Sequence, residues 1–227
     1  MELKRVVVTG MGALTPLGNN VQDYWNGLVN GVSGADMITL FDASKFRTKF
    51  ACEIKNFQAT DFLDRKEARK IDRFTQLALF VSDQAMTDAG LTRDNINPDR
   101  VGVVFASGIG GLITFQHEVT DFAKGDGTPR FNPFFIPKMI LDIAAGQISM
   151  RHNLRGPNFA VVSACASSTN AIMDAFNLIR LGKSDIILTG GSEAVISEAG
   201  VGGFNAMKAM SERNDDPQTA SRPYDKD

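Results

Sequence analysis

Short apolar runs alternate along this chain with segments of helical periodicity. Each run is rich in hydrophobic residues, and the runs lie at residues 5–9, 101–106, 159–162 and 185–189. Runs this short and this continuous are typical of strands buried on both faces, as in a parallel sheet covered by helices. The alternation predicts an α/β layered domain with a mixed, mostly parallel sheet.

Helical patterns fill the intervals between these runs. The clearest is 64–90, where apolar residues recur at steps of three and four, Asp64 and Glu67 resemble a capping box, and Gly90 supplies a stop. A glycine- and proline-rich loop is expected at 124–137. Because the pattern weakens after Gly191 and nothing closes the fold, we expect residues 1–227 to be one incomplete half of a larger domain. The shorter predicted helices are 21–29, 112–123, 138–152 and 166–181.

The composition is that of an ordinary globular protein, with 43% hydrophobic and 22% charged residues. A formal net charge of −2 gives no overall attraction to nucleic acid or to an anionic membrane. No stretch approaches the roughly 18 apolar residues of a membrane-spanning helix, and the first apolar run is too short for a signal peptide. Cys52 and Cys165 lie far apart, which argues against a disulfide framework or a thiolate metal site. We therefore expect a cytoplasmic location.

One motif places a cysteine where nucleophilic chemistry is favoured. Residues 163–171 (SACASSTNA) lie where a predicted strand turns into a helix. At the first turn of a helix, unpaired backbone N–H groups and the helix dipole favour the thiolate form of Cys165. Small neighbours leave room for a bulky thioester, and they leave the N–H of Cys165 available to a developing oxyanion. From spacing alone, a buried structural cysteine is an equally good interpretation, and for Cys52 it is the better one.

Glycines near the N-terminus suggest a second kind of site. Gly10 and Gly12 follow the first predicted strand, as in a dinucleotide-binding fingerprint. The fingerprint requires a third glycine where this chain has Thr15, and Pro16 follows within the segment that should be helical. These two departures disfavour nucleotide binding.

Segments in one collinear order resemble the β-ketoacyl-[acyl-carrier-protein] synthases, and the elongating synthase II type most closely. The resemblance implies a thiolase-like, layered αβαβα architecture made of two similar halves, of which this chain is the N-terminal one. It also implies a homodimer that needs no metal or organic cofactor. The segments are 6–18 (VVVTGMGALTPLG), 107–112 (SGIGGL), 161–171 (VVSACASSTNA), 190–194 (GGSEA) and 221–225 (SRPYD).

The resemblance implies an acyltransferase, a 3-oxoacyl-[acyl-carrier-protein] synthase of fatty-acid elongation. Cys165 would take an acyl group from acyl carrier protein, and decarboxylation of malonyl carrier protein would then drive the condensation. In the family, two histidines and a phenylalanine N–H of the second half complete this chemistry. His117 and His152 match neither histidine motif, and we interpret them as a helix-surface and a helix-end residue. The chain alone is therefore expected to be inactive.

Three alternatives stay open. A related thiolase-like acyltransferase would use coenzyme A in place of the carrier protein. A non-catalytic subunit that only shapes chain length would replace the active cysteine, so the retention of Cys165 argues against it. Taken literally, the chain is an inactive fragment or half of a split enzyme.

Basic residues on the predicted 64–90 helix form a candidate docking surface. By resemblance, Lys66, Arg69 and Lys70 would bind the acidic carrier protein. A merely solvated helix face is the alternative interpretation. Lesser candidates for docking are Lys208 and Arg130.

Apolar residues complete the set of implied site residues. Ile109, between two glycines, would gate the acyl pocket behind Cys165, and Phe204 would flank the same pocket. The predicted strand 159–162 would pair with its two-fold mate across the dimer.

Overall fold

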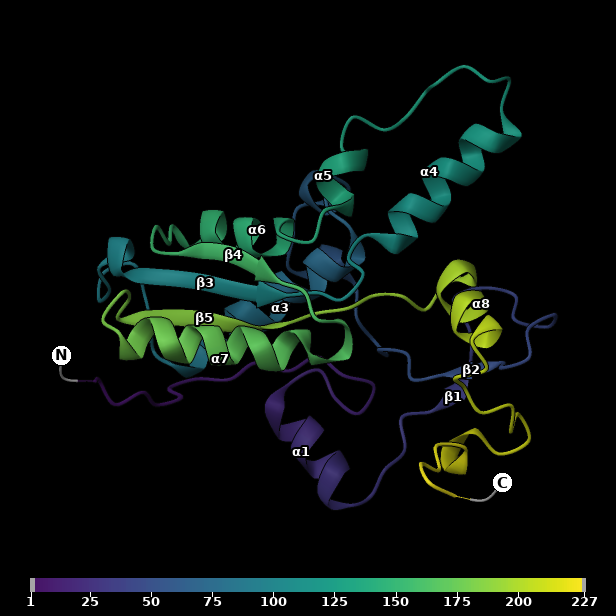
Figure 1. The fold of residues 1–227 in the computed structure, drawn as a ribbon, viewed down its shortest axis with the longest axis horizontal. Helices are drawn as coiled ribbons and strands as arrows, with labels where there is room; N and C mark the ends of the chain where they lie inside the picture. Colours follow the sequence, from purple (N-terminus) through teal and green to yellow (C-terminus); the bar gives the residue numbers. More distant parts are fainter. Residues whose placement is uncertain (1–2, 226–227) are drawn as a thin grey trace. The chain divides into compact units, whose positions relative to one another are not determined.

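The computed structural model describes residues 3–225, and their contacts divide the chain into two compact units. The larger unit contains the segment up to Gly12 and residues 59–194. The smaller unit contains residues 13–58 and the segment from Val195 onward. Figure 1 labels the strands and most of the helices of the two units. The prediction that residues 1–227 make up a single domain half stays a prediction.

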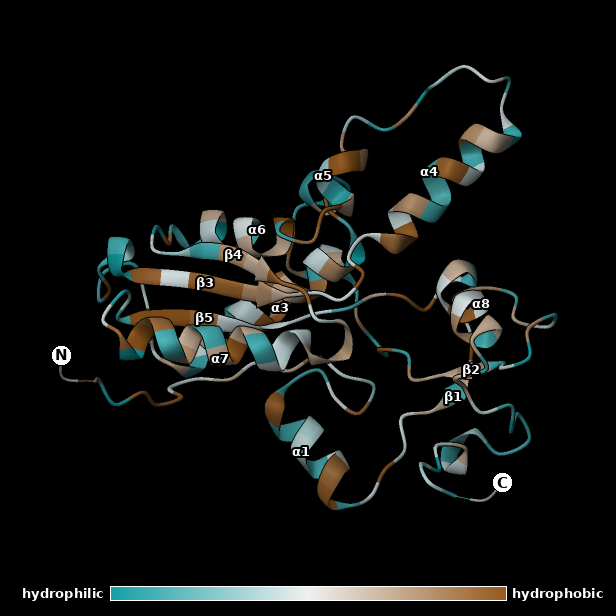
Figure 2. Ribbon diagram, viewed as in Figure 1, coloured by the Kyte–Doolittle hydropathy of each residue, from teal (hydrophilic) through white to brown (hydrophobic). Residues whose placement is uncertain are grey.

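A three-stranded parallel sheet forms the centre of the larger unit, in the order β4 (Asn158–Val161), β3 (Val101–Ala106), β5 (Ile186–Gly191). All six residues of β3 are buried, and Figure 2 shows this strand as largely hydrophobic. A strand that is paired on both edges and covered on both faces excludes water from every residue. The three central strands predicted from the apolar runs, and their parallel arrangement, are confirmed.

Helices cover both faces of this sheet (Figure 1). α7 (Ser167–Arg180) packs on one face, while α6 (Ile143–His152) packs on β3 and β4 from the other, beside α3 (Arg73–Asp88). Alanines make the close approach possible, since Ala78 of α3 and Ala171 of α7 are fully buried. Burial of apolar surface is the main stabilising term in folding, so this three-layer core fixes the ends of the strands.

The predicted helix 64–90 is broken in the structure. A short α2 (Arg65–Ala68) ends in a turn, and α3 begins anew at Arg73 with Asp72 as its N-cap. The buried Asp72 carboxylate accepts the Phe74 N–H at 3.1 Å, and its other oxygen accepts the Thr114 N–H at 3.1 Å and hydroxyl at 2.6 Å. The apolar periodicity continues across the turn, which is why the sequence pattern did not reveal the break.

The predicted strand at 5–9 is not a strand in the structure. Within the described residues no strand pairs with this segment, and Val7 and Val8 are exposed. The segment instead lies against α3 through bare backbone, because a Cβ at Gly12 would fall 2.1 Å from the Val81 carbonyl oxygen and one at Gly10 would fall 2.4 Å from that of Ala85. Its β-branched composition predicted a strand, but strand pairing requires a neighbour.

The region between β3 and α6 also differs from prediction. α4 (Leu112–Lys124) agrees with the predicted helix, but α5 (Phe135–Met139) lies partly in the expected loop, and α6 begins five residues later than predicted, at Ile143. The backbone is extended at Ile140, which separates the two helices. Phenylalanine rings in contact with one another hold α5 to α4, with centroids 5.3–6.3 Å apart. These rings belong to Phe115, Phe122, Phe131 and Phe135.

The smaller unit contains α1 (Val21–Val29), which has the predicted bounds, and an antiparallel pair of short strands, β1 (Asp36–Met37) and β2 (Phe50–Ala51). It also contains α8 (Glu198–Ala206), whose interior glycines weaken the helical pattern of its sequence. The two segments that make up this unit are joined by hydrogen bonds between Thr48 and Asn205.

A partly buried ion pair joins α3 to α6. Arg151 donates to Asp83 through Nε at 2.7 Å and through Nη2 at 2.6 Å, and His152 Nε2 lies 3.2 Å from the same carboxylate. Burial raises the pKa of Asp83, but the hydrogen bonds from Arg151 and the close contact with His152 outweigh burial and bring the pKa below its ordinary value. The carboxylate therefore stabilises the helix pair in its charged form.

Replacing Asp83 with asparagine should lower the free energy of unfolding by about 1–3 kcal/mol at neutral pH, because it weakens charge-assisted hydrogen bonds to Arg151. Since the pKa is lowered on folding, this contribution is complete above about pH 4 and is lost as the pH falls further. Urea unfolding followed by circular dichroism at pH 7 and pH 3 checks both statements. Asp99→Asn, which removes only an exposed pair with Arg155, is the matched control. If D83N lost as much unfolding free energy relative to the wild type at pH 3 as at pH 7, the stabilising role of the charged Asp83 carboxylate would be contradicted.

Candidate active site

The C-terminal ends of the three parallel strands meet at one edge of the sheet. β3 ends at Ala106, which pairs with Val161 of β4 and with Gly191 of β5. A loop, 107–110, follows β3, and it lies between the segments that follow its two neighbours. In parallel sheets this edge is where ligands bind.

Cys165 lies on a sharp turn between β4 and α7, in the single 3₁₀ turn Ala164–Ala166. We call residues 163–167 the elbow. Ala164 has φ of +52°, a left-handed conformation that L-residues seldom adopt. The sulfur-bearing residue is exposed, as are Ala164 and Ala166, so small groups surround an accessible thiol. The exposure does not fit the interpretation of Cys165 as a buried structural cysteine. The sequence favours the same interpretation for Cys52, and it is wrong there, because Cys52 is exposed as well.

Side-chain hydrogen bonds hold the strained backbone of the elbow. The buried Ser167 hydroxyl accepts the Ser163 N–H at 2.8 Å and donates to the Ala164 carbonyl oxygen at 2.7 Å. Asn170 Nδ2 donates to Ser163 Oγ at 2.7 Å. Backbone strain of this kind persists only where its surroundings determine it. The serines and the asparagine of the motif therefore fix the turn that presents Cys165.

The loop 107–110 is bound by a single carboxylate. Glu193, two residues beyond β5, accepts the Ser107 hydroxyl at 3.0 Å and the N–H groups of Gly108, Ile109 and Gly110 at 2.8, 3.0 and 3.2 Å. Glu193 belongs to the GGSEA segment, but the sequence pattern alone predicts no role for it. The only signal was an acidic residue two positions after a strand that ends in glycine.

Ile109 is carried by this loop beside the elbow. Its neighbour Gly108 lies between Glu193 and the elbow. A Cβ at Gly108 would be 2.9 Å from Glu193 Oε2 and 3.4 Å from the Ala164 carbonyl oxygen. Ile109 itself is exposed. Phe204 lies on α8 in the smaller unit, so its predicted place at the acyl pocket stays a prediction.

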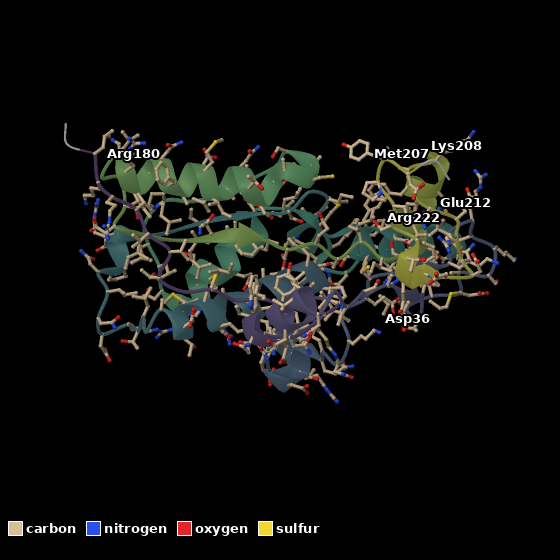
Figure 3. All side chains as sticks on the ribbon, turned by 90° about the horizontal axis from the view of Figure 1, so that it is seen from below. Asp36, Arg180, Met207, Lys208, Glu212 and Arg222 are labelled. Atoms are coloured by element: carbon tan, nitrogen blue, oxygen red, sulfur yellow. The ribbon has the colours of Figure 1, made fainter. Side chains whose placement is uncertain are left out.

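The predicted docking residues Lys66, Arg69 and Lys70 are all exposed, on α2 and the turn after it. Lys70 Nζ lies 5.7 Å from the centroid of the Phe134 ring, a cation–π distance. Lys208, in the smaller unit, is exposed just beyond the end of α8, and Figure 3 labels it. Arg130 is also exposed and pairs with Asp126 at 3.3 Å.

The two histidines take the places predicted for them. His117 is exposed on α4, and His152 is the last residue of α6, where Asp83 holds it. Among residues 3–225, no three histidine, cysteine or acidic side chains come together as metal ligands. In the same range, no helix is both long and apolar enough to cross a membrane.

Comparison with known proteins places this arrangement in a family context. Residues 3–227 match the family described as beta-ketoacyl synthase, N-terminal domain. The chain is 47% identical to a 3-oxoacyl-[acyl-carrier-protein] synthase 2 of Synechocystis, over 100% of this chain and 54% of that protein. It is 45% identical to the Staphylococcus aureus (strain N315) protein of the same name, over 97% of this chain and 53% of the relative. The chain thus spans about half the length of these curated relatives.

A solved structure confirms the fold. The crystal structure of a beta-ketoacyl synthase from Burkholderia phymatum STM815 superposes with a TM-score of 0.86 at 31% identity, over 98% of this chain and 55% of that one. The fold is therefore the N-terminal half of the thiolase-like, layered architecture that the sequence predicted.

Replacing Ser167 with alanine should lower the free energy of unfolding by about 1–3 kcal/mol, because the Ser163 N–H and the Ala164 carbonyl lose their buried partner. Thermal and urea unfolding check this. Ser168→Ala is the control, since Ser168 is the exposed neighbour in the same helix turn and its loss should cost less than about 0.5 kcal/mol. Equal stability of the two variants would show that the hydroxyl does not hold the elbow.

Proposed function

Because the chain belongs to the beta-ketoacyl synthase family, we propose that it is the N-terminal half of an elongating 3-oxoacyl-[acyl-carrier-protein] synthase of fatty-acid synthesis. The observation that carries the proposal is Cys165, exposed on a strained strand-to-helix turn that its own motif holds in place. The names of the relatives supply the substrate class, because both are synthases that act with acyl carrier protein.

The first step is acyl transfer to the cysteine. The Cys165 thiolate attacks the carbonyl carbon of an acyl thioester, an S–C bond forms, and the bond to the carrier thiol breaks. The carrier leaves as a thiolate and takes up a proton. α7, with 14 residues, directs its N-terminus at the elbow, which favours negative charge on the sulfur. The backbone N–H of Cys165 is suited to stabilise the oxyanion of the tetrahedral intermediate.

The second step forms the carbon–carbon bond. Malonyl carrier protein loses carbon dioxide, and the resulting enolate carbon attacks the carbonyl carbon of the Cys165 thioester. A carbon–carbon bond forms, the C–S bond breaks, and the Cys165 sulfur leaves as a thiolate. In this proposal the histidines and the second oxyanion donor come from the second half of the enzyme. His117 and His152 take no part, since one lies exposed on α4 and the other is held by Asp83. The sequence of steps needs no metal or organic cofactor.

The proposal also covers the acyl pocket, the oligomeric state and the cellular location. Ile109 gates the acyl pocket and Phe204 flanks it, which is supported for Ile109 by the contact of its loop with the elbow. The enzyme is a cytoplasmic homodimer in which β4 pairs with its two-fold mate. Supporting this, β4 is an outer strand of the sheet and Phe159 is 38% exposed.

Iodoacetamide should alkylate Cys165 about tenfold faster than Cys52, because the N-terminus of α7 stabilises the negative charge of the attacking sulfur in the transition state. Both cysteines are exposed, so accessibility alone does not predict a difference. Peptide mass spectrometry of the folded chain after timed labelling gives both rates, and labelling in urea should make them equal. Equal, slow labelling in the folded protein would remove the support for an activated Cys165.

Reversing the charge of Lys66 and Arg69 should raise KM for acyl carrier protein about tenfold with little change in kcat, because both exposed cations would attract the acidic carrier. The effect should shrink at high salt. The same variant of the complete enzyme should accept acyl-coenzyme A normally. Preference for coenzyme A in the wild-type enzyme would favour the alternative acyltransferase.

Lys183→Glu is the matched control for this experiment. Lys183 is exposed in the turn between α7 and β5, at the edge of the sheet where the strands begin. Charge reversal there should leave KM for the carrier protein unchanged. Because Lys183→Glu changes the net charge half as much as the double variant does, any clear rise in KM in the control would indicate an effect of net charge and not of a docking surface.

A further inference from the structure

The loop 107–110 turns consecutive backbone donors toward one point. The N–H groups of Gly108, Ile109 and Gly110 all reach the Glu193 carboxylate within 3.2 Å, and the Ser107 hydroxyl joins them. Successive N–H groups that converge in this way form a concave anion-binding surface. Here the anion is a side chain of the protein, so the loop and Glu193 form one unit.

The other side of the loop is in contact with the backbone of Lys138 and Met139. A Cβ at Gly111 would lie 2.3 Å from the Lys138 carbonyl oxygen, and the Gly111 N–H donates to the Met139 carbonyl at 3.2 Å. Gly110, with φ of +74°, adopts a conformation that favours glycine. The segment is therefore held between Glu193 and the end of α5. Among residues 108–111, Ile109 is the one residue with a side chain.

We propose that Glu193 is a positioning residue that fixes Ile109 at the elbow and thereby limits the length of acyl chain that Cys165 accepts. The inference rests on the proposed function, because it assigns the specificity of that same site. Glu193 acts through the loop: its carboxylate sets the backbone of Gly108, which abuts Ala164, and so sets where Ile109 stands.

Glu193→Gln should release this loop. An amide keeps one acceptor oxygen but turns an NH₂ group toward N–H donors, and it carries no charge. In the complete enzyme, E193Q should speed hydrogen–deuterium exchange of the 108–110 amides about tenfold. It should also raise acylation of Cys165 by palmitoyl relative to octanoyl carrier protein about threefold to tenfold, because a loosened Ile109 yields to longer chains.

Glu53→Gln provides a matched control. Glu53 is a buried carboxylate of the smaller unit that likewise accepts backbone N–H groups, from Thr39 at 3.0 Å and Leu40 at 3.2 Å, and the Thr39 hydroxyl at 2.7 Å. E53Q should therefore lower stability without changing exchange at 108–110 or the palmitoyl-to-octanoyl ratio. Ile109→Phe should shift that ratio in the opposite direction, toward the shorter chain.

Ser107→Ala keeps the experiment informative if E193Q does not fold. It removes one of the donors to Glu193 and leaves the charge in place. Exchange of the 108–110 amides and the palmitoyl-to-octanoyl ratio should therefore each rise about threefold. Glu193→Asp, which keeps the charge, should restore part of the wild-type ratio. Unchanged exchange at 108–110, or a ratio that stays at the wild-type value while exchange rises, would overturn the inference.

The two proposals fail in different ways. If wild-type Cys165 takes no acyl group from either donor, the proposed function is wrong and the specificity role falls with it. If the wild type is acylated but E193Q shows the wild-type chain-length ratio, the proposed function stands and Glu193 is only structural.

Discussion

The register that pairs β3 with β4 and β5 is the constraint on which the rest of the larger unit depends. Because Ala106 is matched to Val161 and to Gly191, the three segments that follow the strands leave the sheet at one level. The elbow, the loop 107–110 and Glu193 are neighbours for that reason alone. A shift of one strand by a single residue would turn its side chains to the opposite face. At Gly102 of β3 a Cβ would lie 2.7 Å from the Pro157 carbonyl oxygen, so a larger residue could not take this place.

At this edge, backbone groups and not large side chains form the site. The elbow strains Ala164, and Ser167 bonds both sides of the strained residue. The adjacent loop satisfies its N–H groups with a carboxylate. Both arrangements keep large side chains away from Cys165, and both leave few backbone polar groups without a partner. The chemistry proposed for the sulfur and the selection proposed for the acyl chain thus follow from the same hydrogen-bond requirement.

Sequence patterns predicted the elements whose signal is local. The apolar run of β3, the bounds of α1 and the strand-to-helix turn at Cys165 can all be read from residue order. The features that were missed depend on partners distant in sequence. Asp72 breaks a periodic helix because Thr114 completes its hydrogen bonds, and Glu193 acquires a role only when its strand lies beside β3. The segment 5–9 shows the converse, since a β-branched run does not form a strand without a neighbour to pair with.

The glycine contacts between the N-terminal segment and α3 have a consequence for how this protein tolerates sequence change. At Gly10 and Gly12 main chain meets main chain, so neither partner has a rotamer with which to adapt. One added methyl group at either position must displace a whole segment and not a side chain. These backbone contacts fix the distance between the N-terminal segment and α3. Substitutions elsewhere on α3 can be accommodated by repacking of side chains, whereas a substitution at Gly10 or Gly12 cannot.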